Sequence, residues 1–268
     1  MSEVDVVIAM ILGIFQGLVE WLPISSSGQT IIAMVDILEM DADTALSFAF
    51  YLHFGTLLAV LLKYRRDVKH IIIELPKVKE DKMVQFIVVS TMTSFLVGLP
   101  VYILLLSIFE GGMEGDLVTL FVGFFLILTG IIIYVSKRKT GSRGIGDSNT
   151  KDSILAGICQ GFAVLPGLSR SGVTVAALVS KNFKQEVALH LSFLMSIPAI
   201  IGIMAIEIFR GKVASIGIAP VIAGIAASFI VGYLMIDILL RFAQKVKFGS
   251  FCVVFGIIAV IVGIMVLM

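Results

Sequence analysis

Charged residues are scarce in this chain of 268 residues, where Asp, Glu, Lys and Arg together make up 15%. With 59% hydrophobic residues and a mean hydropathy of +1.09, the chain has too little polar surface to cover a water-soluble fold. A net charge of +1 gives no sign of a nucleic-acid partner. The two cysteines, Cys159 and Cys252, lie in apolar segments and do not suggest a disulfide framework. The composition indicates an all-α polytopic protein surrounded by membrane lipids.

Sequence signatures of soluble enzymes are also missing. The chain contains no Walker loop, HExxH helix, pair of CxxC motifs or Rossmann glycine pattern. These absences remove the commonest nucleotide-binding and zinc-dependent classes.

Long apolar stretches occur instead. A helix needs about 20 apolar residues to cross the hydrocarbon core of a bilayer. We expect six such spans, at residues 44–62, 86–109, 117–135, 187–209, 216–240 and 249–268. Two further apolar segments, 4–35 and 153–180, are interrupted by Pro, Ser and Gly.

The two interrupted segments are related to each other in sequence. Residues 13–30 and 157–174 are identical at eight of 18 aligned positions. Each interrupted segment is followed by three expected spans, which predicts two repeats in one membrane domain, residues 1–135 and 153–268. The polar stretch 136–152 (SKRKTGSRGIGDSNTKD) is expected to be a cytoplasmic linker.

The positions of the basic residues predict the orientation in the membrane. Of 20 Lys and Arg residues, 17 fall in loops that would share one side, which is the cytoplasmic side by the positive-inside rule. Residues 153–180 must then enter and leave on that side, and they are too few for two crossings. We therefore expect a re-entrant helix-loop-helix here and another at 4–35, in an inverted-topology repeat. This predicts a multi-pass protein of the cell membrane with both termini and the site's opening outside.

Polar residues inside the first interrupted segment suggest a functional site. Gln16 and Glu20 are four residues apart and share a helix face, and Pro23 follows them at the break. The run Ser25 to Gly28 then offers hydroxyl groups and free backbone N–H groups at a helix start, an arrangement that suits an anion.

The second interrupted segment repeats this arrangement and adds a guanidinium group. Residues 166–172 read PGLSRSG, which places Arg170 between Ser169 and Ser171. An arginine near the bilayer centre costs at least about 3 kcal/mol on insertion scales and needs a partner. Its planar fork suits a phosphate or a carboxylate.

The polar residues also allow other interpretations. Arg170 and Glu20 could form a purely structural ion pair, with the serines capping helices. We interpret His53 as a hydrogen-bonded packing residue. We expect Glu207 and Asp237 to be exposed to water near the ends of their spans. Inverted repeats with broken helices are also a transporter architecture, so a flippase for polyprenyl phosphate is an alternative function.

At these residues the chain resembles the integral-membrane undecaprenyl-diphosphate phosphatases, also called bacitracin-resistance proteins. The first shared motif runs from Gln16 through Glu20 into WLPISSSG at 21–28. The second is Pro-Gly-x-Ser-Arg-Ser-x-x-Thr, here residues 166–174. The resemblance runs along the whole chain.

The resemblance implies an enzyme that removes the terminal phosphate of a polyprenyl diphosphate and so recycles a carrier lipid for the cell envelope. It further implies a divalent metal ion, Mg²⁺ or Ca²⁺, and a homodimer is a further expectation. The implied catalytic residues are Glu20, Ser26 and Arg170, the implied metal-binding residues are Gln16 and Glu20, and the implied substrate-binding residues are Ser25, Ser27, Gly28, Ser169, Ser171 and Thr174.

One position departs from the family pattern. Much of the family has His after the glycine of the first motif, where this chain has Gln29. A glutamine amide cannot act as a nucleophile or a proton shuttle. We therefore expect Ser26 or a metal-activated water to be the nucleophile and Glu20 to be the base.

Overall fold

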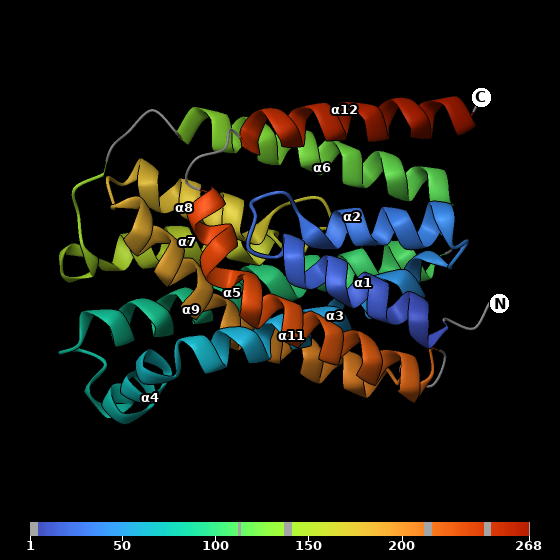
Figure 1. The fold of residues 1–268 in the computed structure, drawn as a ribbon. Helices are drawn as coiled ribbons and strands as arrows, with labels where there is room; N and C mark the ends of the chain where they lie inside the picture. Colours follow the sequence, from blue (N-terminus) through green and yellow to red (C-terminus); the bar gives the residue numbers. More distant parts are fainter. Residues whose placement is uncertain (1–4, 112–113, 137–140, 212–215, 244–247, 268) are drawn as a thin grey trace.

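The computed structural model describes residues 5–111, 114–136, 141–211, 216–243 and 248–267, and these are almost entirely helical (Figure 1). Within these ranges there is no β-strand, only an isolated bridge between Arg143 and Phe183. The helices are α1 (Val6–Val19), α2 (Ser26–Ile32), the π-helix η1 (Ala33–Ile37), α3 (Ala42–Lys63), α4 (Arg65–Glu74), the short η2 (Leu75–Lys77), α5 (Lys82–Glu110), α6 (Gly115–Ser136), the short η3 (Ile145–Asp147), α7 (Thr150–Phe162), α8 (Arg170–Ser180), α9 (Gln185–Arg210), α11 (Ile218–Ala243) and α12 (Phe248–Leu267).

Among the described residues, five helices are long and apolar enough to cross a membrane: α3, α5, α6, α9 and α11. Each coincides with one of the expected spans to within a few residues. The sixth expected span, residues 249–268, corresponds to α12, whose apolar part among the described residues, Cys252–Met265, is shorter. The prediction of an all-α, multi-pass membrane protein is confirmed.

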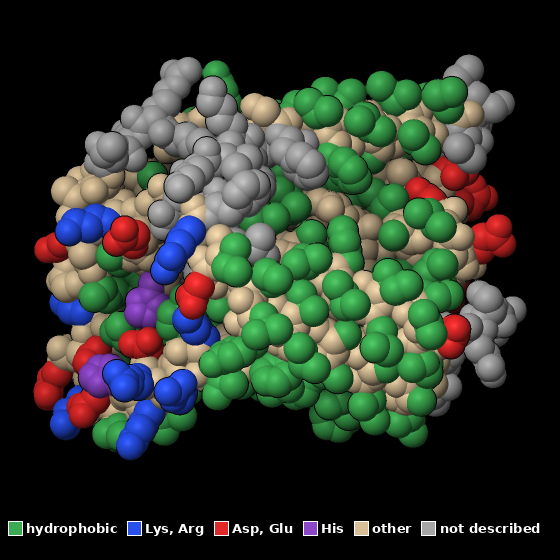
Figure 2. All heavy atoms as spheres, viewed as in Figure 1, with side chains coloured by type: hydrophobic (Ala, Val, Ile, Leu, Met, Phe, Trp, Pro, Cys, Tyr) green, Lys and Arg blue, Asp and Glu red, His purple; other side chains and the backbone are tan. Residues whose placement is uncertain are grey.

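Charged and apolar side chains occupy different zones of the surface. Figure 2 shows Lys, Arg and His at one end of the molecule, mixed with Asp and Glu, only Asp and Glu among the charged side chains at the other end, and a broad hydrophobic band between them. Near the middle of α5 Leu96 is 77% exposed, and near the middle of α11 Ile230 is 53% exposed, as expected of side chains that face lipid. The first turn of α1 and the last turn of α12 both lie at the end away from the basic residues (Figure 1).

The two interrupted segments form short helical hairpins, α1–α2 and α7–α8. Helix α1 has 14 residues and α7 has 13, so each is about 20 Å long against a hydrocarbon core of about 30 Å. Pro23 has no backbone N–H and cannot continue α1. In the second hairpin Gly167 has a φ of +93°, a conformation that glycine adopts at little cost.

Glycines let the hairpins pack closely against long helices of the other half of the chain. A Cβ atom on Gly13 would lie 2.2 Å from the carbonyl O of Gly224 in α11. A Cβ atom on Gly157 would lie 2.6 Å from the carbonyl O of Ser90 in α5. These glycines therefore serve as small packing positions between helices.

The tips of the two hairpins touch each other. Gly28, in the first turn of α2, lies against the loop before α8: a Cβ atom on Gly28 would be 2.7 Å from the backbone N of Gly167 and 2.8 Å from Cγ1 of Val122 in α6. Thr129 of α6 fixes the second tip, donating to Gly167 O at 3.0 Å and accepting from Ser169 N at 3.0 Å. The two tips can thus come this close because Gly28, at the contact, has no side chain.

Replacing Gly28 with Ala should therefore force the tips apart. We expect a loss of about 1–3 kcal/mol of folding free energy, the usual cost of overpacking, measured by thermal unfolding of the purified protein in detergent. Gly146→Ala is the control, because nothing lies within 4 Å of a Cβ at Gly146. Equal thermal stability of the two variants would contradict the tip contact.

Candidate functional site

Glu20, at the end of α1, is the centre of a polar cluster between the hairpin tips. Its Oε2 accepts hydrogen bonds from Gln16 Nε2 at 2.9 Å and from Ser26 Oγ at 2.7 Å. His53 of α3 approaches the same oxygen with Nε2 at 3.3 Å. The other oxygen, Oε1, accepts a hydrogen bond from Nη2 of Arg170. Glu20 is only 6% exposed, so this carboxylate depends on its protein partners.

Arg170 is the first residue of α8 and is held by that helix and by α9. Its Nη1 donates to the carbonyl O of Ser192 at 3.3 Å. Thr174 Oγ1 lies 2.7 Å from the carbonyl O of Arg170 and 2.7 Å from Ser192 Oγ. A guanidinium group has five N–H donors, and the contacts with Glu20 and Ser192 engage two of them. Further donors can therefore serve an oxyanion.

The serines around this ion pair differ in their roles. Ser169 caps α8, accepting from Gly172 N at 3.2 Å, and its Oγ lies 3.4 Å from Ser171 Oγ. Ser25 has a φ of 59°, and its buried Oγ has no hydrogen-bond partner among the described residues. Burying a hydroxyl group without a hydrogen-bond partner costs free energy, unless a ligand or a water molecule binds it.

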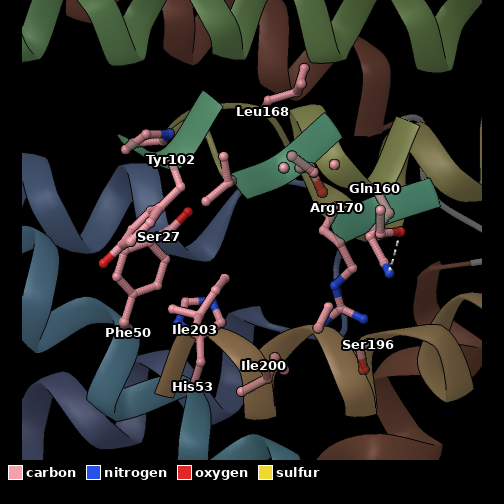
Figure 3. A pocket seen from close by; sticks show the side chains of 18 of the residues that line it. Ser27, Phe50, His53, Tyr102, Gln160, Leu168, Arg170, Ser196, Ile200 and Ile203 are labelled. Carbon is pink, nitrogen blue, oxygen red and sulfur yellow. Dashed lines mark hydrogen bonds between the residues drawn. The ribbon is translucent and has the colours of Figure 1, made fainter. Parts of the chain in front are cut away.

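One cavity collects most of the expected site residues (Figure 3). It holds about 1180 Å³ of space, open mouth included. Its wall includes Glu20, Ser25, Ser26, Ser27, Ser169, Arg170 and Ser171. Gln16 and Thr174 support these residues from behind, and Gly28 provides the tip contact, but none of the three lines the cavity.

Other cavity-lining residues were not expected from the sequence. His53 lines the wall and contacts Glu20, so it belongs to the site as well as packing there, with Nδ1 2.7 Å from Ala49 O. Tyr102, Gln160 and Ser196 also line it. Gln160 is the counterpart of Gln16 in the repeat. This match is the feature of the sequence that could have indicated Gln160 as a site residue.

Glu207 was expected to be exposed to water near the end of a span, and that expectation is wrong. It is fully buried, accepts a hydrogen bond from the Tyr102 hydroxyl, and pairs with Arg210 one turn along α9. Arg210 reaches across to Asp43 and Glu110 and ties the ends of α3, α5 and α9 together. Asp237 is 56% exposed and pairs with Lys63, as suits its expected interface position.

Gln29, at the position where much of the resembling family has His, faces away from the cavity. Its Nε2 donates to the carbonyl O of Ile24 at 2.7 Å, and it does not line the cavity. The side chain stabilises the loop between α1 and α2. Gln29 thus takes no part in the contacts of the Glu20 carboxylate, which include Ser26 and His53.

The residues present can contribute to binding a divalent ion but do not enclose one. No group of three or more His, Cys, Asp or Glu side chains suited to a metal occurs among the described residues. Beside Glu20, however, the amide oxygen Oε1 of Gln16 is buried and without a partner in that part of the chain. Mg²⁺ is commonly held by one or two carboxylates with phosphate oxygens and waters. Glu20, which lines the cavity, and the Gln16 amide oxygen behind it are the side-chain oxygens that would hold an ion shared with a bound phosphate.

The site as a whole suits an oxyanion that carries an apolar group. Arg170 and the unsatisfied Ser25 hydroxyl group line the cavity, and α5 and α9 supply apolar side chains to the same wall. A model of the family described as bacitracin resistance protein BacA matches residues 9–265. The chain belongs to the BacA family.

Curated members of other organisms resemble the chain over nearly its full length. A protein named undecaprenyl-diphosphatase from Methanothrix thermoacetophila is 39% identical over 254 residues, 95% of each chain. Proteins of the same name from Methanopyrus kandleri and Methanococcoides burtonii are 37% and 38% identical and cover 98% and 94% of this chain, and 97% and 96% of their own. The BacA resemblance inferred from the two motifs is confirmed.

A double-mutant cycle should show that Glu20 and Arg170 depend on each other. Glu20→Ala or Arg170→Ala leaves one buried charge unpaired, and we expect each to cost about 3–5 kcal/mol of folding free energy. The double variant should lose clearly less than the sum, measured by thermal unfolding. The exposed pair Lys63–Asp237 is the control, with a coupling below about 1 kcal/mol. Additive effects at Glu20 and Arg170 would contradict the pairing.

Proposed function

We propose that this BacA-family protein hydrolyses undecaprenyl diphosphate, or a similar polyprenyl diphosphate, to the monophosphate and inorganic phosphate. The observation that supports this most strongly is the ion pair of Glu20 with Arg170, in a cavity with unsatisfied hydroxyl groups and an apolar wall. The relatives named undecaprenyl-diphosphatase support the same reaction. The product would re-enter carrier-lipid use in cell-envelope assembly.

The hairpin tips would supply the positioning and charge neutralisation on which phosphoryl transfer depends. Arg170 would neutralise the terminal phosphate. Ser26 donates a hydrogen bond to Glu20 at 2.7 Å, the reach expected of a nucleophile and its base. The Ser26 oxygen would attack the terminal phosphorus as its proton moves to Glu20, and the phosphoanhydride bond would break with the lipid monophosphate leaving. Water would then hydrolyse the phosphoserine and regenerate Ser26.

A divalent ion would be held by Gln16 and Glu20 together with the diphosphate oxygens. When bound, such an ion supplies Lewis-acid stabilisation of the charge on the transferred phosphoryl group. The buried amide oxygen of Gln16, which has no partner among the described side chains, is the structural support for this assignment.

The architecture would consist of six spans and two re-entrant hairpins in an inverted repeat. The packing supports a two-fold relation between residues 1–135 and 153–268: α1 packs on α11 and α7 on α5, while α3 pairs with α9 and α6 with α12. The two hairpins lie at opposite ends of the molecule and meet at their tips (Figure 1). In a bilayer they would enter from opposite leaflets and place the site near the midplane.

The protein would sit in the cell membrane with its basic end in the cytoplasm. Both termini would then be outside, at the end where Figure 2 shows only acidic residues among the charged ones. The cavity wall includes Tyr102 and Ile206, near the ends of α5 and α9 on that side. This placement supports an opening toward the outer face.

Phosphate release by the purified protein from undecaprenyl diphosphate, with Mg²⁺ or Ca²⁺ present, tests the proposal. We expect Glu20→Ala and Arg170→Ala each to lower kcat/KM at least about 100-fold, because donors and bases that act on the transition state are worth that much. Chelation of divalent ions should abolish release, and added Mg²⁺ or Ca²⁺ should restore it.

Lys63→Ala and Asp237→Ala remove an ion pair outside the cavity and serve as matched controls, with rates close to the unmodified protein. Unchanged release by both site variants would show that the catalytic assignment is wrong. Lipid phosphate moving between liposome leaflets without any release would favour transport instead of hydrolysis.

A further inference from the structure

The apolar wall of the cavity reaches the outer surface of the protein between α5 and α9. Phe95 and Leu99 of α5 line the cavity, yet they are 41% and 44% exposed. Ile200 and Ile203 of α9 line the same cavity (Figure 3). Phe95 and Leu99 therefore belong both to the cavity wall and to the accessible surface of α5.

The outer face of α5 beside this wall is apolar. Met92 and Leu96, on either side of Phe95, are 69% and 77% exposed, and Ile103 is 59% exposed. In a multi-pass membrane protein such a face lies against lipid chains. The medium just outside Phe95 and Leu99 is therefore hydrocarbon.

Phe95 closes the boundary between the two helices by lying on a glycine. A Cβ atom on Gly202 of α9 would be 2.3 Å from Cε1 and 2.4 Å from Cζ of Phe95. The ring edge thus rests on the backbone of α9, at a position where any other residue would collide with it.

We propose that the prenyl chain of the substrate leaves the cavity between α5 and α9, with Phe95 on Gly202 as the movable closure of this α5–α9 seam. The inference rests on the proposed function, because it assigns a route to the tail of that substrate. A chain of many isoprene units is too long for the cavity. Its methylene groups are far more stable in hydrocarbon than in water, so the tail stays in the bilayer while the diphosphate reaches Arg170.

The dependence of KM on the length of the substrate's prenyl tail tests the α5–α9 seam. The substrates are undecaprenyl diphosphate and dimethylallyl diphosphate, whose five-carbon tail fits inside the cavity. Phe95→Trp narrows the seam and should raise the KM ratio of long to short substrate about tenfold, within the range that pocket contacts discriminate. Phe124→Ala is the control, because Phe124 is 60% exposed on α6 and does not line the cavity.

Photocrosslinking provides a second test that does not depend on how Phe95→Trp folds. A benzophenone amino acid at Leu99 should crosslink to a radiolabelled methylene-bridged undecaprenyl diphosphonate, and one at Phe124 should label at background level. Equal labelling at both positions, or equal KM changes for both substrates, would contradict the α5–α9 seam as the route of the prenyl tail. The proposed hydrolysis of the diphosphate would be unaffected by either result. If the unmodified protein releases no phosphate from either substrate, the proposed function fails instead.

Discussion

The site depends on one buried ion pair that joins two hairpins from different halves of the chain. Glu20 and Arg170 are 150 positions apart, and each is costly to bury alone in an apolar environment. The pair is stable only because Gln16, Ser26 and the Ser192 carbonyl satisfy further donors and acceptors. A buried charge pair is weak evidence for stability by itself. Its retention beside unsatisfied hydroxyl groups is better explained by a charged ligand.

The fold around the pair provides a rigid support for it. Glycines at the contacts of α1 with α11 and of α7 with α5 bring backbones together, so the two tips are held by close packing on long helices. Because each hairpin stops part-way along the molecule, its polar loop lies inside the protein and not in lipid. Irregular backbone within a membrane domain is tolerated only where it is buried in protein or lines a cavity, and residues of both hairpin loops line the cavity.

The sequence predicted those features that depend on composition and spacing along the chain. Five of the six expected spans coincide with helices long and apolar enough to cross a membrane, and the need of Arg170 for a partner followed from the cost of an isolated charge in a membrane. His53 and Glu207 could not be placed in this way. Their partners lie on other helices: Tyr102 is 105 positions from Glu207, and His53 reaches Glu20 from α3. Such contacts arise from helix packing, which leaves no local pattern in one sequence.

The most direct test is an experimental structure with a methylene-bridged polyprenyl diphosphonate, in which the scissile oxygen is replaced. We expect phosphonate oxygens within about 3 Å of the Arg170 guanidinium and of Ser26 Oγ, between the two hairpin tips. A head group bound elsewhere, with the Glu20–Arg170 pair untouched or the two residues far apart, would contradict it.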